Sequence, residues 1–199
     1  SKDPQIHLLR WKKEFNYSAI NNFGAAHAKG EYLLFLNNDI KTINPDWMTE
    51  MLGVCQRPEV GGVGAKLIYP DNTIQHAGVV IGLGAHRSAG HTHYKMPRQH
   101  LGYMGRLCYA QDVTAVTGAC LMVKKSIYEE VDGLDESFTI SLNDVDLCLK
   151  IREKGYLNIF TPFAELYHYE SKTRGMEEGE KQKRFQQEVD MFRRKWKAD

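Results

Sequence analysis

Tyr32-Leu33-Leu34-Phe35-Leu36 is a continuous apolar run that leads directly into the polar triplet Asn37-Asn38-Asp39. A run of this kind predicts a central strand that is covered on both faces of a sheet. The segment before it, 18–29, has apolar residues at helical steps, so we expect a helix that Ser18 caps and that ends at Gly30. A helix, a buried strand and a polar turn in this order are typical of an α/β sheet.

Similar units follow along the chain. The sequence predicts a helix after Asn44-Pro45 that buries Trp47, Met48, Met51 and Leu52, strands over 63–69, 114–123 and 157–161, a short helix opened by the capping-box spacing of Ser126 and Glu129, and a helix over 144–154 closed by Gly155. Because these helices alternate with apolar strands, we expect an α/β fold with a mostly parallel central sheet flanked by helices.

The middle of the chain, 82–112, has no sustained period and is rich in Gly, His, Arg and Tyr. Loops of this length inside a compact domain are usually functional or mobile. This one holds His86, His91, His93 and His100. A His-x-His pair with further histidines could bind zinc, but neither a cysteine partner nor a helical HExxH spacing accompanies it, so we favour a polar lid.

The end of the chain is predicted to be a charged helix, and we divide the sequence into a main part, 1–175, and this helix, 176–199. The apolar residues of the helix, Phe185, Val189, Phe192 and Trp196, repeat along one face. We expect this stripe to pack on the main part as ordinary core. The alternative is that it docks on a partner, on a missing part of the domain or on a membrane surface.

Composition bounds the class of protein. The 199 residues are 42% hydrophobic and 26% charged, which is typical of one globular domain. The net charge of +1 gives no field that would favour nucleic acid. No apolar run is long enough to span a bilayer and no signal peptide is evident, so we expect a cytoplasmic protein. The widely spaced Cys55, Cys108, Cys120 and Cys148 are interpreted as reduced, buried structural thiols.

Asn38 and Asp39 are the first candidate site residues. Ligands of open α/β sheets bind beyond the carboxyl ends of the strands, and these residues follow such an end. A carboxylate flanked by amides suits a hard cation such as Mg²⁺ or Mn²⁺ that is shared with substrate phosphates. Asn and Asp are also common turn residues, and the triplet alone favours that interpretation.

Asp144 and Asp146 form the second candidate. They are two positions apart, so they cannot share one face of a helix. At a helix start, Asp144 is either a partner of the helix dipole, with Ser141 or Asn143 as the cap, or a general base. The motif alone favours the first alternative.

His168 and Arg174 form the third candidate, after the strand predicted at 157–161. A neutral imidazole at His168 could ligate a metal, and the Arg174 guanidinium could hold a phosphate. A lone histidine near a strand end is more often simply hydrogen-bonded.

Taken in order, these motifs resemble those of family 2 inverting glycosyltransferases with the GT-A fold, and most closely the bacterial members that build surface polysaccharides. The segment 29–39 resembles their strand and Asp-x-Asp motif, 116–123 with 132–136 their central strand and following loop, 143–150 their acidic catalytic motif, and 166–171 their late histidine motif. The likeness extends from Phe15 to Arg174.

Two features depart from the family pattern. Asn37 stands where many members have Asp, and Asn143 where many have Glu or Asp, so the local negative charge is lower. The family's first strand, with its Pro-Thr-Tyr-Asn-like segment, and the Asp-rich turn of the next strand are absent. We therefore expect 1–175 to be the carboxyl-terminal part of a GT-A domain that is incomplete at its amino terminus.

The resemblance implies roles for the candidate residues. Asp39 would ligate a divalent metal, Mg²⁺ or Mn²⁺, with Asn38 beside it near the sugar nucleotide. Asp144 would be the general base and His168 a further metal ligand. Arg174 is added as a nucleotide contact because its guanidinium could hold a phosphate. The implied partners are a nucleoside-diphosphate sugar and a saccharide or lipid-linked acceptor, with no nucleic acid and with peripheral contact at the inner face of the membrane left open.

The implied function is transfer of a sugar from a nucleoside diphosphate to an acceptor hydroxyl with inversion, in the synthesis of cell-surface polysaccharide. Two alternatives stand beside it. One is a non-catalytic fragment that binds a carbohydrate or a partner, and the other is a metal-dependent phosphohydrolase that uses the same carboxylates to activate water.

Overall fold

The structure is a computed structural model that describes residues 3–83, 88–169 and 179–197. Its helices are α1 (Tyr17–His27), α2 (Trp47–Cys55), the short 3₁₀ helix η1 (Tyr103–Gly105), α3 (Lys125–Glu130), α4 (Asn143–Glu153) and α5 (Glu180–Trp196), and its strands are β1 (Tyr32–Leu36), β2 (Ile40–Thr42), β3 (Val60–Ile68), β4 (Ile74–His76), β5 (Val79–Ile81), β6 (Ala89–His91), β7 (Gln111–Val113), β8 (Cys120–Lys124) and β9 (Leu157–His168). The α/β class predicted from the sequence is confirmed.

The central sheet has the strand order β1-β8-β3-β9-β2, with β4 paired to β3 and β7 paired to β9. Among the described strands, β3 and β9 form the parallel pair, and the other pairs of this sheet are antiparallel. The sheet is therefore mixed, and the prediction of a mostly parallel sheet was wrong. Because β1 and β3 are each antiparallel to β8, the strands β1, β3 and β9 point the same way and their carboxyl ends lie along one edge.

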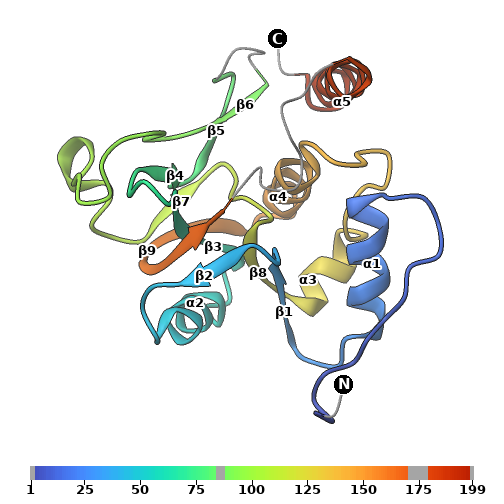
Figure 1. Cartoon of the computed structure of the whole chain (residues 1–199), viewed down its shortest axis with the longest axis horizontal. Helices are drawn as coiled ribbons and strands as arrows, with labels where there is room; N and C mark the ends of the chain where they lie inside the picture. Colours follow the sequence, from blue (N-terminus) through green and yellow to red (C-terminus); the bar gives the residue numbers. More distant parts are fainter. Residues whose placement is uncertain (1–2, 84–87, 170–178, 198–199) are drawn as a thin grey trace.

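The core lies on both faces of β3. Helix α2 covers one face and α4 the other, as Figure 1 shows. Every residue of β3 is buried, so β3 is the central strand that is covered on both faces. The prediction that 32–36 has this role was wrong, because β1 lies at the end of the strand order and its Leu36 is 45% exposed. Gly64 lets the chain approach closely, because a Cβ there would lie 2.4 Å from the Cβ of Val116.

The segment 82–112 holds more regular structure than its sequence predicts. It contains β6, η1 and the start of β7, and β6 pairs with β5 in a small separate sheet. Arg98 links the segment to the main sheet, because its Nη2 lies 2.7 Å from Oε2 of Glu165 on β9. The other oxygen of Glu165, Oε1, lies 2.9 Å from Lys66 Nζ on β3. Local patterns missed these short strands because their pairing is set by partners in the folded chain.

The helix starts differ from the predicted ones. The cap of α1 is Asn16, whose side chain accepts from Ala19 N, whereas Ser18 is buried and donates to the Phe138 carbonyl. Helix α3 begins at Lys125 and has no side-chain cap, so the capping box predicted at Ser126 does not form.

The other corrections concern bounds and exposed faces. On α2, Trp47 and Met51 are buried as predicted, together with Cys55, whereas Met48 is 48% exposed and Leu52 is only partly buried. Strand β8 begins only at Cys120, although the sequence predicts a strand from 114. Strand β9 continues past Pro162, because a register irregularity next to the proline lets pairing with β3 resume at Glu165.

The cysteines are free, and three of them fit the predicted role. Cys55, Cys120 and Cys148 are buried, and burial raises the pKa of Cys120 and Cys148 to about 12 in each case, so these thiols stay protonated. Cys108 is exposed, contrary to the expectation that all four are buried.

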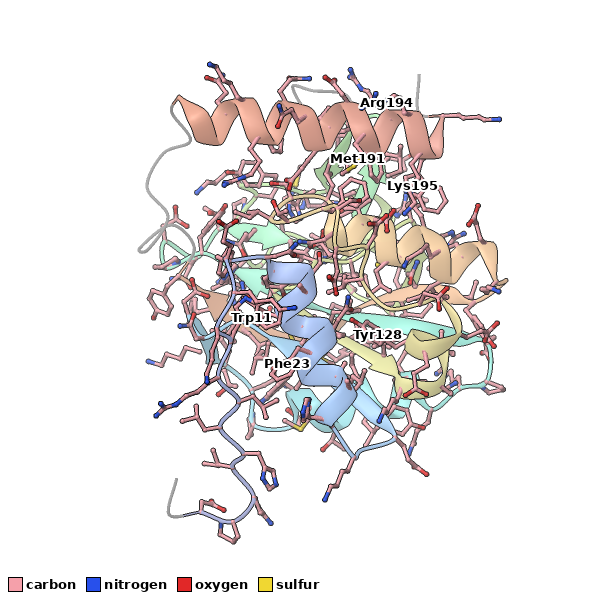
Figure 2. All side chains as sticks on the ribbon, turned by 90° about the vertical axis from the view of Figure 1, so that its right-hand side faces the viewer. Trp11, Phe23, Tyr128, Met191, Arg194 and Lys195 are labelled. Atoms are coloured by element: carbon pink, nitrogen blue, oxygen red, sulfur yellow. The ribbon has the colours of Figure 1, made fainter. Side chains whose placement is uncertain are left out.

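The apolar stripe of α5 packs on the domain, as expected. Val189 and Phe192 are fully buried, and the Phe192 ring centroid lies 6.3 Å from that of Phe138. Phe185 and Trp196 are half-buried at the margins of the stripe. Figure 2 shows Met191 and Lys195 on the side of α5 that faces the domain and Arg194 on the outer side. No helix in the described ranges is long and apolar enough to cross a membrane.

Candidate active site

Asp39 and His168 meet at the edge where β1 and β9 end. Strand β2 begins directly after Asp39 and pairs Ile40 with His168. The Tyr169 amide also donates to the Asp39 carbonyl at 3.0 Å. As a result, Asp39 Oδ1 and His168 Nε2 lie 3.1 Å apart. The predicted approach of these two side chains is confirmed.

A glutamine from β4 orients the His168 ring. The Nδ1 atom lies 2.6 Å from Gln75 Oε1, and because an amide oxygen only accepts, Nδ1 carries the proton and donates it. In the neutral ring, Nε2 then has a lone pair on the side of Asp39 and of Asn37, whose Nδ2 is 3.4 Å away. Metal-binding histidines are commonly oriented by such a hydrogen bond from the other ring nitrogen.

The donor atoms of this pair suit a cation. Asp39 Oδ1 is buried and has no hydrogen-bond partner among the described residues, although His168 Nε2 lies 3.1 Å away. A buried carboxylate oxygen without a partner is costly, and a cation would relieve that cost. No group of three or more His, Cys, Asp or Glu side chains that could hold a metal occurs in the part of the chain that is described. Asp39 and His168 therefore fit as two protein ligands of an ion that takes its other ligands from substrate and water.

Asp144 lies in the first turn of α4, with its carboxylate held by backbone amides. Gly118 N donates to Oδ2 and Val145 N donates to Oδ1, each at 2.8 Å. Gly118 leaves room for this approach, since a Cβ there would stand 3.3 Å from the Asp144 Cβ and equally close to the Tyr17 hydroxyl. The carboxylate is fixed in direction and still partly exposed, which a general base requires.

The segment 117–119 connects the two halves of the site. Ala119 O accepts from Asn37 N at 3.0 Å, at the start of the polar triplet. One residue earlier, Gly118 N binds Asp144. A single backbone segment therefore places the triplet that contains Asp39 and the carboxylate of Asp144 relative to each other.

Asp146 faces away from this site, as its spacing from Asp144 predicts. It is fully buried, and its Oδ1 accepts from Trp196 Nε1 at 2.9 Å and lies 2.7 Å from Lys195 Nζ. The predicted caps of α4 are not formed as expected. The cap position is Leu142, at φ 61°, and Asn143 Oδ1 accepts only from the adjacent Asp144 N.

Two histidines near the site were not predicted to belong together. His76 Nδ1 and His91 Nδ1 lie 2.8 Å apart, and His76 Nε2 lies 3.4 Å from the amides of Gly78 and Thr117. Burial above all, with His91 and His168 nearby, lowers the pKa of His76 well below its usual value, so this ring is neutral. Period-2 alternation separates Gln75 and His76 onto opposite faces of β4, but the partner of each is set by the folded chain, so no local pattern revealed these contacts.

The remaining predicted site residues are Asn38, Arg174 and the histidines of 82–112. Asn38 is exposed beside Asp39 at the same turn. Arg174 and His86 lie outside the described residues. The histidine set predicted as a polar lid does not form a metal cluster within the described ranges.

Comparisons with known proteins bear on the family. Residues 1–132 match the family model described as glycosyl transferase family 2. An uncharacterized protein y4gI of Sinorhizobium fredii is 52% identical over 98% of this chain and 22% of its own length. The O-antigen biosynthesis protein RfbC of Myxococcus xanthus is 40% identical over 86% of this chain and 13% of its own. An N-acetylglucosaminyl-diphospho-decaprenol L-rhamnosyltransferase of Mycobacterium tuberculosis is 26% identical over 73% of this chain and 49% of its own. The chain thus spans half or less of the length of each of these relatives.

Solved structures show the same fold at low sequence identity. GalNAc-T7 with UDP, GalNAc and Mn²⁺ superposes with a TM-score of 0.67 at 13% identity, covering 92% of this chain and 36% of that one. The mannosyltransferase PcManGT of Pyrobaculum calidifontis, in complex with GDP-Man and Mn²⁺, gives a TM-score of 0.57 at 16% identity, covering 92% and 44%. These likenesses show the GT-A fold.

Proposed function

This chain belongs to glycosyl transferase family 2. We propose that it contains the residues that bind the metal and activate the acceptor in a site that transfers a sugar from a nucleoside diphosphate to an acceptor hydroxyl. The synthesis of cell-surface polysaccharide is the proposed setting. RfbC, a relative at 40% identity, is described as an O-antigen biosynthesis protein and supports that setting.

The observation that carries the proposal is the approach of Asp39 Oδ1 and His168 Nε2 to 3.1 Å. The same backbone segment that anchors the triplet before Asp39 also anchors Asp144. Asp39 and His168 would hold a divalent metal, Mg²⁺ or Mn²⁺, which when bound supplies Lewis-acid stabilisation to a departing diphosphate. Asn38 is proposed to contact the sugar nucleotide at this turn, and Arg174 to hold one of its phosphates.

Asp144 is the proposed general base. Its carboxylate takes the proton from the acceptor hydroxyl as that oxygen bonds to the anomeric carbon. The bond from the anomeric carbon to the diphosphate oxygen breaks in the same displacement, and the nucleoside diphosphate leaves. The Gly118 and Val145 amides donate to the two oxygens of this carboxylate and limit its rotation. Inversion at the anomeric carbon follows from a single displacement.

We expect donor consumption to depend on the acceptor. Purified protein is incubated with Mn²⁺ and a panel of UDP-, GDP- and dTDP-linked sugars, with and without an acceptor saccharide, and released nucleoside diphosphate is measured. Release that rises with acceptor supports the transferase. Release at the same rate without acceptor supports a phosphohydrolase, and binding of saccharide without any release supports a non-catalytic module.

We further propose that the protein contacts the inner face of the membrane, where lipid-linked acceptors lie. The buried stripe of α5 cannot supply this contact. The exposed apolar side chains of 101–104 are better placed, with Leu101 64%, Tyr103 78% and Met104 80% exposed. Met104 also holds a left-handed backbone conformation, at φ 52°, which is unusual for this residue type.

The vesicle prediction follows from these side chains. We expect the protein to co-sediment with vesicles that contain anionic lipid, and Tyr103→Ser with Met104→Ser to reduce the bound fraction severalfold, because apolar insertion stabilises binding in proportion to the buried apolar area. Met48→Ser, which alters an exposed apolar side chain on α2, is the matched control. Equal binding of the loop variant and the control would contradict the proposal.

A further inference from the structure

The buried carboxylate of Glu188 on α5 binds the backbone that leads into α4. Glu188 is 3% exposed, and its Oε1 accepts from Thr139 N at 2.8 Å, from Thr139 Oγ1 at 2.6 Å and from Ile140 N at 3.2 Å. Its Oε2 accepts from Ser141 N at 2.9 Å. Three successive backbone amides and one hydroxyl thus converge on one side chain. A buried charge is tolerated only when it is satisfied in this way, so the contact is specific in direction.

The segment that Glu188 holds ends in a strained residue. Leu142 occupies the cap position of α4 in the left-handed region, and no side chain caps the helix there. Such a conformation persists only where the surrounding structure fixes it. Asp144 follows two residues later, so any change in the path of 139–142 moves its carboxylate relative to Gly118.

The far end of α5 holds α4 at a second point. Trp196 Nε1 and Lys195 Nζ both contact Asp146 Oδ1, at 2.9 Å and 2.7 Å. Lys195 Nζ also lies 2.7 Å from Asp135 Oδ2, so it links α4 to the loop after α3. Asp144 therefore lies between two contacts of α5, one on the segment before it and one two residues after it.

We propose that α5 is a positioning element for the proposed base, in which Glu188, Lys195 and Trp196 keep the start of α4 in the orientation that aims Asp144 at the acceptor. This inference rests on the proposed function of Asp144. Glu188 itself does not touch the reacting atoms. It acts through the backbone of 139–141. Helix α5 lies on the side of α4 that Asp146 faces, and it affects sugar transfer by holding the start of α4 in place.

The test compares two carboxylate-to-amide changes on the same helix. Glu188→Gln places an NH₂ group where a carboxylate oxygen now accepts, so at least one of the three amides loses its partner. We expect amide hydrogen exchange at Thr139, Ile140 and Ser141 to accelerate about 10-fold or more. We expect kcat to fall about 10-fold to 100-fold, with the KM for the donor within about twofold of the wild-type value. Losing a supporting hydrogen bond, or displacing a catalytic group, changes rates by factors of this size. Asp190→Asn makes the same chemical change on the exposed face, where the side chain contacts Gln186, and should alter neither quantity.

A double substitution separates positioning from loss of stability. If Glu188 acts through Asp144, then Glu188→Gln causes little further loss of kcat in an Asp144→Asn background. A multiplied loss, or an unchanged kcat despite faster exchange at 139–141, would overturn the proposal. If Asp144→Asn alone transfers at the wild-type rate, the assignment of the base fails instead, whatever the exchange data show.

Trp196→Phe provides a second variant should Glu188→Gln fail to fold. It keeps the aromatic body of the side chain and removes the Nε1 donor to Asp146. We expect a loss of kcat of a few-fold, again with little change in the KM for the donor. A wild-type kcat in a folded Trp196→Phe protein that shows faster exchange in the first turn of α4 would contradict the role of this second contact.

Discussion

Asp144→Asn is expected to lower kcat for sugar transfer by about 10²-fold to 10⁴-fold, because an amide cannot take the acceptor's proton. The fold should be retained. An asparagine keeps one oxygen to accept from Gly118 N, and Asn is a good residue at the start of a helix. The measurement is initial-rate transfer with saturating donor and acceptor, alongside thermal unfolding of the same samples.

The control is the carboxylate of Asp112, which pairs with Arg152 in the last turn of α4, at the other end of the helix from Asp144. Asp112→Asn should leave kcat near that of the wild type and lower stability slightly, because its pair with Arg152 is partly solvated. If Asp144→Asn retained the wild-type rate with a small loss of stability, Asp144 would be a helix-start residue only, which is the alternative that its position on α4 also allows.

The sequence predicted those parts of the site that depend on strand ends. The apolar run 32–36 and its polar triplet predicted that Asp39 lies at a strand's carboxyl edge, and β1 does end at Leu36. The meeting of Asp39 with His168 was expected from the shared direction of the strands that precede them. The structure adds the detail that β2, which was not predicted, pairs in antiparallel register with the end of β9 and sets the contact.

The missed parts are those that depend on long-range partners. Nothing local to 74–76 marks Gln75 as the partner of His168, because the two residues are 93 positions apart in sequence. Glu188 reads as one more charge on a charged helix, and only the folded arrangement shows it buried against 139–141. The mixed sheet was missed for the same reason, since strand direction is fixed by connections rather than by the apolar pattern of each strand.

Among the proposed metal ligands, Asp39→Asn is expected to have the largest effect. Removing the charged ligand should weaken Mn²⁺ binding by at least about 10²-fold, since an amide oxygen is a far poorer ligand for a hard cation than a carboxylate. Loss of Lewis-acid stabilisation at the leaving diphosphate should lower kcat by about 10²-fold or more, because the metal contributes several kcal/mol and each 1.4 kcal/mol is about tenfold in rate. Mn²⁺ binding is measured by titration calorimetry in the presence of UDP, GDP or dTDP, and transfer is measured against Mn²⁺ concentration.

Two further variants decide whether the contact seen in the structure is a metal site. Gln75→Leu removes the acceptor of His168 Nδ1, and it should weaken Mn²⁺ binding by about 10-fold to 100-fold because the tautomer with a free Nε2 is no longer favoured. Asp71→Asn alters an exposed carboxylate in the turn before β4 and should change nothing, since its contacts are local to Thr73 and Lys95. If Asp39→Asn and Asp71→Asn bound Mn²⁺ equally well, Asp39 and His168 would be a hydrogen-bonded turn and the metal would have to be held elsewhere. A graded loss, largest for Asp39→Asn, smaller for Gln75→Leu and absent for Asp71→Asn, is the pattern that a two-ligand site oriented by Gln75 produces.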